Sequence, residues 1–398
     1  MFESLKPVAG DPILGLMAAF RADSRAHKID LGVGVYQDDS GRTPVMKSVK
    51  LAEAKLMELE NTKAYQGIAG DAGYNQLMMA LLFGSDHGIL NSDRLVTLQA
   101  PGGSGSLRVG AEVVQRARPD AKLWVGTPTW PNHIPLMGSA GFEIEEYPYY
   151  DKTTHSINID AMMETLNRVP AGDVVLLHGC CHNPTGADLQ PEHWDQIADI
   201  ALERGFIPFI DIAYQGLGQS LDADAYGLRM MADRLPELLV ASSCSKNFGL
   251  YRERTGSISM IAESAEQAKI VAAQSMSTAR QIYSMPPAHG ALLVSLILGD
   301  DQLRANWQAE LEEVRLRITS MRTLLTDGIN NNAAGMDFSH IKQQQGMFSF
   351  LGITSDQLNR LREEFAIYIV GSTRVNLAGI NSTNIDYLTQ SIRTVLDS

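Results

Sequence analysis

Short apolar runs alternate with helical patterns through the middle of the chain. Continuous apolar runs predict buried strands over residues 95–98, 123–125, 174–177, 206–210, 238–241 and 258–261. Helical patterns over 106–117 and 191–203 lie between them, and Gly205 is the predicted C-cap of the second. Uninterrupted apolar strands separated by helices are typical of a parallel sheet that is covered on both faces. We therefore predict an α/β fold with a mainly parallel central sheet flanked by helices.

A different pattern follows in the last quarter of the chain. Apolar residues recur there at intervals of three or four, which is the spacing of one helix face. They are Leu303, Trp307, Leu311, Val314, Ile318, Met321 and Leu325. The predicted helix is long enough to bridge two domains. Strands predicted at 347–351 and 367–370 indicate a smaller α+β domain after it.

Composition narrows the class of protein. The 398 residues are 44% apolar, and 33 basic against 46 acidic side chains give a net charge of −13. This balance is unlike that of proteins that bind nucleic acid or anionic membranes, which need clustered Lys and Arg. No apolar run is long enough for a membrane span, and three cysteines predict reduced thiols, not a disulfide framework. We expect a cytoplasmic protein without nucleic-acid or membrane partners.

Polar residues follow four of the predicted strands, at the edge of the sheet where ligands bind in such folds. The first segment, 101–105, reads Pro-Gly-Gly-Ser-Gly before a helix. Its backbone amides and the helix N-terminus suit an anion. It lacks the Gly-Lys-Ser/Thr of a Walker loop, and Arg108 stands where a dinucleotide fingerprint needs its third glycine. A simple glycine turn is the alternative.

The second polar segment, 178–186, reads His-Gly-Cys-Cys-His-Asn-Pro-Thr-Gly. Two histidines and two cysteines suggest a metal, but adjacent cysteines are expected to point apart and no C-x₂-C pair is present. We therefore predict no metal site. Asn183 precedes Pro184, so its backbone is expected to be extended and its amide fixed for hydrogen bonding. A turn with buried histidines is the alternative.

The third and fourth segments carry ionisable residues. Asp211 ends the apolar run 206–210, and a carboxylate there needs a partner: a cationic ring nitrogen, a structural arginine or a helix N-terminus. Tyr214 can face the same cavity. Lys246 follows another buried strand, where desolvation would lower its pKa and favour a Schiff base, unless it is a solvated loop lysine. A lysine, a carboxylate and an anion cradle together are what pyridoxal 5′-phosphate requires.

Over essentially its whole length the sequence resembles the aspartate and aromatic amino-acid aminotransferases, fold-type I enzymes of class I that use pyridoxal 5′-phosphate. The resemblance extends from Asp11-Pro12-Ile13-Leu14-Gly15 to Arg374-Val375-Asn376-Leu377-Ala378-Gly379. It is most specific in 178–186 and in 243–254, which reads Ser-x-Ser-Lys-Asn-x-Gly-Leu-Tyr-x-Glu-Arg. It implies an N-terminal arm with the first part of the small domain (1–44), a large cofactor-binding domain (45–313) and a small domain (314–398).

The resemblance also implies a role for each matching residue. Lys246 would bind the cofactor aldehyde and then shuttle a proton, and Asp211 would pair with the pyridinium nitrogen. Asn183 and Tyr214 would contact the phenolic oxygen, and Trp130 would stack on the ring. Of these, Lys246, Asp211, Tyr214 and Trp130 would be the catalytic residues. The phosphate would be held by Gly103, Ser104, Ser243, Ser245 and Arg254.

The implied substrates are small-molecule amino acids and 2-oxo acids. Arg374 would bind the α-carboxylate through two parallel hydrogen bonds, helped by the Gly34 amide and close to Trp130 and Asn183. Arg280 would reach the distal carboxylate from the other subunit of a homodimer. Tyr65 would likewise reach the phosphate of the neighbouring subunit. Two such guanidinium groups would select a dicarboxylate such as aspartate, glutamate or 2-oxoglutarate. His133 and His178 would lie behind Asp211.

Several positions depart from the aspartate-specific pattern. They are Ser104 in place of Thr, Ala64 in place of Asn, Gln37 in place of Lys, and Ile282 and Met285 in place of Asn. Aromatic-accepting relatives often carry the serine, and the apolar Leu14 and Met285 could line a pocket for a ring. We expect ping-pong transamination in which aspartate, and aromatic amino acids as well, donate the amino group to 2-oxoglutarate.

Three alternatives remain at this point. The first is an aminotransferase that is primarily specific for aromatic amino acids. The second is another pyridoxal enzyme, such as a decarboxylase or a β-lyase, because the same lysine and aspartate serve all of these. The third is an inactive binding protein on the same fold, against which the intact Lys246, Asp211 and Arg374 argue.

Overall fold

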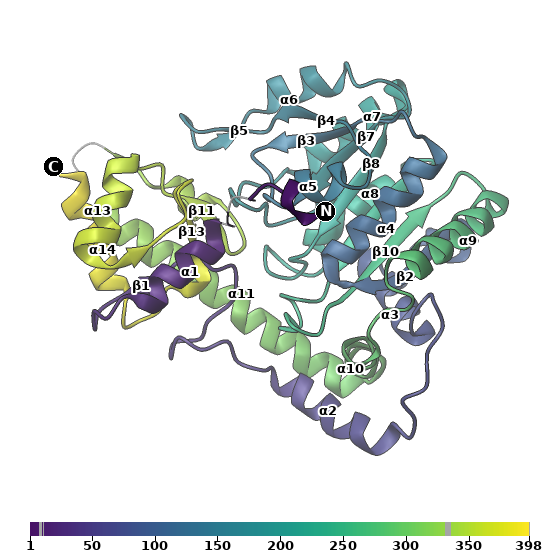
Figure 1. The fold of residues 1–398 in the computed structure, drawn as a ribbon, viewed down its shortest axis with the longest axis horizontal. Helices are drawn as coiled ribbons and strands as arrows, with labels where there is room; N and C mark the ends of the chain where they lie inside the picture. The colour runs from purple at the N-terminus through teal and green to yellow at the C-terminus, as the bar shows by residue number, and fades with distance from the viewer. Residues whose placement is uncertain (8–9, 11, 331–335, 398) are drawn as a thin grey trace.

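A seven-stranded sheet forms the centre of the larger lobe (Figure 1). The computed structural model describes residues 1–7, 10, 12–330 and 336–397, so Asp11, where the resemblance begins, lies outside the described residues. The strand order is β2-β10-β9-β8-β7-β3-β4. Their bounds are Leu95–Pro101 (β2), Thr255–Ile261 (β10), Leu238–Ser243 (β9), Ile207–Ile212 (β8), Val174–His178 (β7), Leu123–Thr127 (β3) and Ile144–Pro148 (β4). Only β10 runs antiparallel to its neighbours, which confirms the mainly parallel sheet.

Two apolar cores cover the two faces of this sheet. Along β7, Val174 and Leu176 belong to one core, and Val175 and Leu177 to the other. The first core includes side chains of α4 (Gly102–Ala117) and α5 (His133–Gly138). The second includes side chains of α3 (Ala72–Phe83), α7 (Pro191–Arg204) and α8 (Tyr226–Arg234). Because both faces are buried, the strands read as continuous apolar runs in the sequence.

The six predicted strands are all present, and the structure corrects details around them. β4 was not predicted, because its sequence Ile-Glu-Glu-Tyr-Pro is half polar, as suits a strand at the edge of the sheet. Helix α4 begins at Gly102 and not at residue 106, so the glycine-rich segment is its first turn. Helix α7 ends at Arg204, and the φ of 77° at Gly205 confirms the predicted C-cap.

The predicted amphipathic helix is α11, which spans Asp301–Asn330. Figure 1 shows it running from the smaller lobe to the underside of the larger one. Near its start it packs against α2 (Lys47–Leu59) and α10 (Ala288–Gly299), and toward its end against α14 (Ile385–Leu396). Since this one helix crosses residues 313 and 314, it joins the two predicted domains as a continuous rod.

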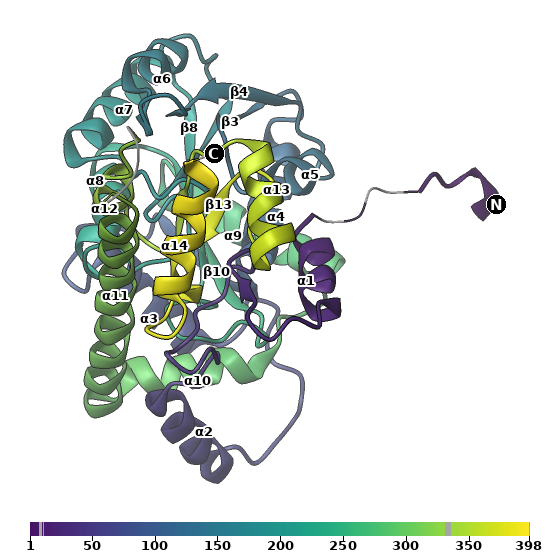
Figure 2. The same cartoon turned by 90° about the vertical axis from the view of Figure 1, so that its left-hand side faces the viewer.

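Segments from both ends of the chain form the smaller lobe. β1 (Ile29–Asp30) pairs in parallel with β12 (Ile367–Tyr368), and β11 (Phe348–Phe350) pairs antiparallel with β13 (Arg374–Asn376). Helices α13 (Ser355–Phe365) and α14 cover these strands in Figure 2, which also shows η1 (Phe2–Ser4) projecting away from the body. The two strands predicted here are confirmed in shorter form.

The remaining elements connect or cover these two lobes. They are α1 (Pro12–Ala22), η2 (Gly88–Asn91), β5 (Tyr150–Asp151), β6 (Ser156–Ile157), α6 (Ile159–Leu166), η3 (Ala223–Ala225), α9 (Ala265–Ile282), α12 (His340–Gln343) and η4 (Leu377–Gly379). Within the described residues, no helix combines the length and the apolar character that a membrane crossing requires.

Candidate active site

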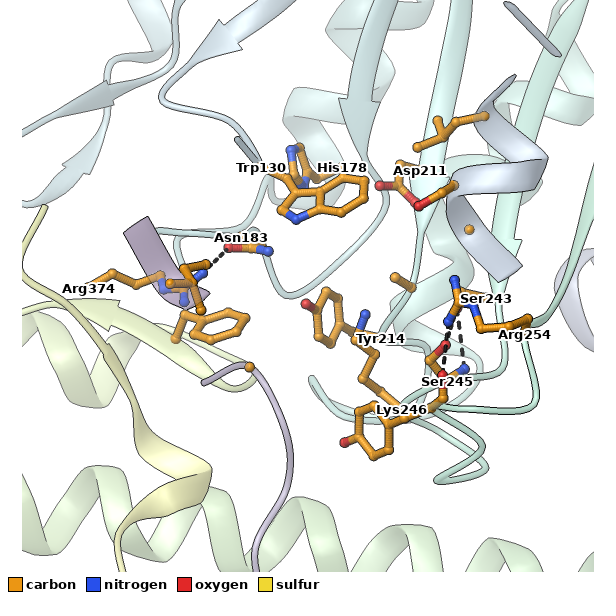
Figure 3. Close-up of a pocket in the computed structure, with 18 residues that line it drawn as sticks. Trp130, His178, Asn183, Asp211, Tyr214, Ser243, Ser245, Lys246, Arg254 and Arg374 are labelled. Atoms are coloured by element: carbon orange, nitrogen blue, oxygen red, sulfur yellow. Dashed lines mark hydrogen bonds between the residues drawn. The ribbon is translucent and has the colours of Figure 1, made fainter. Parts of the chain in front are cut away.

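A cavity of about 290 Å³ lies at the carboxyl ends of the parallel strands, between the two lobes. Most of the residues predicted for the site line it: Gly34, Gly103, Ser104, Trp130, Asn183, Asp211, Tyr214, Ser243, Ser245, Lys246, Arg254 and Arg374. Figure 3 shows Arg374 and Asn183 at one end of this cavity and Ser243, Ser245 and Arg254 at the other. The side chains of Lys246 and Tyr214 lie between these ends.

The carboxylate of Asp211 is buried on β8, beside His178 of β7 in the register of the sheet. His133 donates a hydrogen bond from Nε2 to Asp211 Oδ2 at 3.0 Å, and the buried Oδ1 has no partner in the part of the chain that the structure describes. Burial alone would raise the pKa of Asp211, but the hydrogen bond and charge of His133 hold it below its ordinary value. An ionised carboxylate with one free oxygen fits a cationic ring nitrogen.

Two histidines and a threonine support this carboxylate from behind. The Thr129 hydroxyl lies 2.7 Å from Nδ1 of His133 and 3.0 Å from Nε2 of His178. Burial lowers the pKa of His178 to about 3, so its ring is neutral at physiological pH. Through Thr129 and the two histidines, the hydrogen bond from His133 to Asp211 is part of a buried polar network. This network orients the carboxylate.

Lys246 is half-buried just beyond β9, with Nζ 4.9 Å from the centre of the Tyr214 ring. Burial lowers the pKa of its ammonium to about 8; Arg254 lowers it as well, and Asp211 opposes both effects. A substantial fraction of the amine is therefore neutral near pH 8, and the neutral amine is the form that attacks an aldehyde.

Small side chains at the start of α4 leave room for an anion. A Cβ on Gly102 would lie 2.5 Å from a guanidinium nitrogen of Arg254, and one on Gly103 would lie 3.3 Å from Cβ of Ser243. The hydroxyl of Ser243 donates to that of Ser245 at 3.0 Å. Hydroxyls, a guanidinium and the N-terminus of a 16-residue helix converge here, which fits a phosphate group.

The opposite end of the cavity suits a carboxylate. Arg374 is 4% exposed; its Nη2 donates to the carbonyl of Gly32 at 2.7 Å, and its Nη1 donates to Asn183 Oδ1 at 3.3 Å. Its guanidinium lies 4.4 Å above the ring of Phe348, and its buried Nε finds no partner within the described ranges of the chain. A planar cation held from three sides with a free donor is oriented to bind an incoming carboxylate.

Some predicted residues lie outside the cavity. Tyr65 is 94% exposed, and Arg280 is exposed with its guanidinium donating to the Ser284 hydroxyl. Leu14 and Met285 do not line the cavity, so that expectation is wrong for the single chain. Its apolar wall instead includes Ile13, Leu107, Phe348 and Tyr251, which the sequence did not single out. Tyr251 lies inside the motif 243–254, and this motif was the sequence signal that could have identified it as a site residue.

The expectation that Cys180 and Cys181 point apart is also wrong. Their sulfurs and a carboxylate oxygen of Asp224 all lie within 4.8 Å of one another, because Cys181 has a φ of 51°. This carboxylate already accepts hydrogen bonds from three backbone amides between residues 216 and 219. Burial raises the pKa of Cys181 to about 11, so its thiol stays protonated. The group therefore gives no support to a metal site.

Comparison with known proteins agrees with this geometry. The family model for aminotransferase class I and II matches residues 26–392. The aspartate aminotransferase of Haemophilus influenzae is 49% identical, with 100% of both chains covered. The aromatic-amino-acid aminotransferase of Pseudomonas aeruginosa is 45% identical, with 99% of this chain and 98% of that one covered.

Solved structures give the same result. The aromatic-amino-acid aminotransferase from Burkholderia pseudomallei, covalently bound to pyridoxal phosphate, matches with a TM-score of 0.98 and 42% identity over 100% of this chain and 99% of that one. A psychrophilic aromatic amino acids aminotransferase from Psychrobacter sp. B6, cocrystallised with aspartic acid, also gives 0.98 at 42% identity and covers 100% of both chains. Full-length matches of this quality settle the family: the chain belongs to the class I and II aminotransferases.

Proposed function

We propose that this chain is a pyridoxal-phosphate aminotransferase that moves the amino group of aspartate, and of aromatic amino acids as well, to 2-oxoglutarate. One observation carries the proposal. A single cavity brings together a lysine with a lowered pKa, an ionised aspartate with a free oxygen, an anion cradle and an arginine with a free Nε. The relative from Burkholderia pseudomallei, with pyridoxal phosphate bound covalently, supports the assignment of the cofactor.

When bound, pyridoxal phosphate supplies an aldehyde for the amino group and an electron sink for the negative charge that develops at Cα. Asp211 Oδ1 would accept a hydrogen bond from the ring nitrogen, since no donor among the described residues reaches that oxygen. Ser243, Ser245 and Arg254 would hold the phosphate at the N-terminus of α4. Trp130 and Tyr214 would flank the ring.

Lys246 would move the proton. An amine with a pKa of about 8 both accepts and donates a proton near neutral pH, which general acid–base catalysis at Cα requires. Arg374 would fix the α-carboxylate at the opposite end of the cavity. With the cofactor phosphate held at one end of the cavity and the α-carboxylate at the other, the Cα–H bond would lie within reach of Lys246 on each turnover.

A distal carboxylate needs a second cation, which we propose comes from a partner subunit. Among the described residues that line the cavity, the cationic side chains are Lys246, Arg254 and Arg374, and each already has a role. Arg280 and Tyr65 extend outward on the same chain. The exposed apolar side chains near them and on η1 would be buried in a homodimer: Phe2, Leu5, Ile270, Met276 and Ile282.

Aromatic substrates are supported by the wall of the cavity. Phe348 presents its ring to Arg374, Trp130 lines the same cavity, and Ser104 is smaller than the threonine of the aspartate-specific pattern. Relatives of both names, aspartate and aromatic-amino-acid aminotransferase, cover nearly the whole chain. The three buried free cysteines suit a reducing compartment, and we propose a cytoplasmic location. The division at residues 44 and 313 is likewise part of the proposal.

A substrate panel with 2-oxoglutarate as acceptor tests the function. We expect kcat/KM values for aspartate, phenylalanine and tyrosine within a few decades of one another, and loss of turnover in Lys246→Ala with the cofactor still bound. A phenylalanine value many decades below that of aspartate would exclude the dual specificity. A value for aspartate far below those of the aromatic substrates would favour the enzyme that prefers aromatic amino acids. Undiminished transamination in Lys246→Ala would refute the role of the lysine.

A further inference from the structure

Tyr251 contacts three parts of the candidate active site. Its ring lines the main cavity together with Lys246. Its carbonyl accepts a hydrogen bond at 2.9 Å from Nη1 of Arg254, at the phosphate end. Its hydroxyl accepts a hydrogen bond at 3.0 Å from the backbone N–H of Tyr36, in the segment that carries Gly34. One side chain therefore connects the lysine loop to the substrate end of the cavity.

The segment 32–36 is otherwise held by the smaller lobe. The carbonyl of Gly32 accepts a hydrogen bond from Arg374 at 2.7 Å. The carbonyls of Val33 and Val35 accept hydrogen bonds from the side chain of Asn376 at 2.7 and 2.8 Å. Both donors belong to β13. The Tyr36 amide thus joins this segment to the part of the chain that carries Lys246.

The segment also borders an adjacent space. A second cavity of about 30 Å³ lies behind Lys246, and Tyr36 and Tyr251 are both part of its wall. The rest of that wall is mainly apolar and includes Met46, Leu217 and Val314. Without the hydroxyl of Tyr251, the Tyr36 amide would lose its acceptor, and the segment would have room to shift toward this cavity.

We propose that Tyr251 is a positioning residue for substrate: its hydroxyl holds segment 32–36, and through it the Gly34 amide and the Arg374 guanidinium, at a fixed separation from Lys246. The proposal rests on the proposed function, because that function gives Arg374 and Gly34 the substrate carboxylate. It predicts that Tyr251 acts on substrate binding and leaves the chemistry at Lys246 largely unchanged.

The test is Tyr251→Phe in the full-length holoenzyme, which removes the hydroxyl and keeps the ring. We expect KM for aspartate and for 2-oxoglutarate to rise by roughly three- to tenfold, the worth of one hydrogen bond, while kcat changes by less than about twofold. Tyr147→Phe is the matched control. Tyr147 is buried on β4, and its hydroxyl donates to the Leu176 carbonyl at 2.8 Å, so this variant loses a comparable bond outside the cavity.

Hydrogen exchange gives a second readout that does not depend on activity. In Tyr251→Phe the peptide covering residues 32–37 should exchange faster than in wild type, and in Tyr147→Phe it should not. Faster exchange together with a higher KM supports the proposal. An unchanged KM, a rise no larger than that of Tyr147→Phe, or unchanged exchange overturns it. Wild-type protein without transaminase activity would refute the proposed function instead, and the exchange comparison would still report on the bond.

Discussion

His133 donates a hydrogen bond to one oxygen of the Asp211 carboxylate at 3.0 Å, while the other oxygen has no partner among the residues that the structure describes. The first contact fixes the carboxylate on β8, and the second oxygen is left for a ligand. A buried charge with one empty acceptor position is costly until a cation reaches it. This relationship explains why the site is built to take a protonated ring nitrogen.

Asp211→Asn should therefore reduce the affinity for the cofactor more than it reduces the stability of the fold. The amide keeps the shape but removes the charge that pairs with the ring nitrogen. Losing one partner of a buried ion pair predicts a loss of roughly a hundredfold or more in kcat, with a raised dissociation constant for pyridoxal phosphate. Turnover and equilibrium dialysis measure the two effects.

Asp173→Asn is the control for this substitution. Asp173 is 6% exposed and accepts hydrogen bonds from the Lys122 amide and from Nε1 of Trp124, away from the cavity. This variant should lose stability and keep its affinity for the cofactor. Equal effects of the two substitutions on cofactor affinity would contradict the role of Asp211.

The pKa of Lys246 predicts its reactivity. In the cofactor-free protein, acylation of Lys246 should follow pH with a midpoint of about 8, against an ordinary lysine value of 10.5. Since the Asp211 carboxylate stabilises the ammonium, Asp211→Asn should move this midpoint lower. Peptide mass spectrometry after brief labelling, normalised to the denatured protein, measures both values. A midpoint near that of the denatured chain would show that the amine is not desolvated.

Hybrid dimers test whether Arg280 acts across a subunit boundary. Neither Lys246→Ala nor Arg280→Ala alone should turn over aspartate efficiently. Mixed subunits should regain about a quarter of wild-type activity, because half of the dimers would hold one complete site. Wild type mixed with a Lys246→Ala, Arg280→Ala double variant is the control, since its hybrids have no complete site. Failure of the first mixture to recover activity would place Arg280 in its own subunit's site, and full activity of Arg280→Ala alone would place Arg280 outside catalysis.

Acid should destabilise the fold through His340. Burial lowers the pKa of His340 to about 4; Nε2 donates to the Phe350 carbonyl at 2.9 Å, and Nδ1 has no partner among the described residues. Because the folded pKa lies below the ordinary value, the unfolded chain binds more protons as the pH falls from 6.5 toward 4, and stability decreases. The free energy of unfolding, measured with urea, should fall by about 1–2 kcal/mol less between pH 6.5 and pH 4.5 in His340→Gln than in wild type.

The exposed His27 provides the control, since His27→Gln should leave the wild-type pH dependence in place. An identical loss of stability in His340→Gln and wild type would show that His340 is already free to bind a proton in the folded protein.

The sequence predicted those features that depend on local pattern. Both faces of the sheet are covered, so its strands are apolar throughout, and the polar residues that end them, such as Asp211 and Lys246, had to meet at one edge. The edge strand β4 escaped prediction because two adjacent glutamates interrupt its short sequence, so that no continuous apolar run marks it. The resemblance supplied Arg374, but no sequence pattern indicated that its guanidinium binds the carbonyl of Gly32.

Other features required the folded chain. The thiols of Cys180 and Cys181 come together only because of one backbone angle, and alternation along an extended chain predicts the opposite. Tyr251 belongs to the sequence motif 243–254, but the motif does not predict the hydrogen bond between its hydroxyl and the Tyr36 amide, which lies 215 residues away in sequence. Tyr65 and Arg280 lie outside the cavity in the single chain, and we assign them to a second copy.

The assembly of the substrate end from both ends of the chain has a consequence for biosynthesis. Gly32 and Arg374 are 342 residues apart, and β1 pairs with β12. At about 5–20 residues per second, a ribosome needs roughly 20–70 seconds to travel from one partner to the other. The sheet that carries Asp211 and Lys246 is translated within that interval. A nascent chain therefore contains the residues for the cofactor well before it can recognise a substrate.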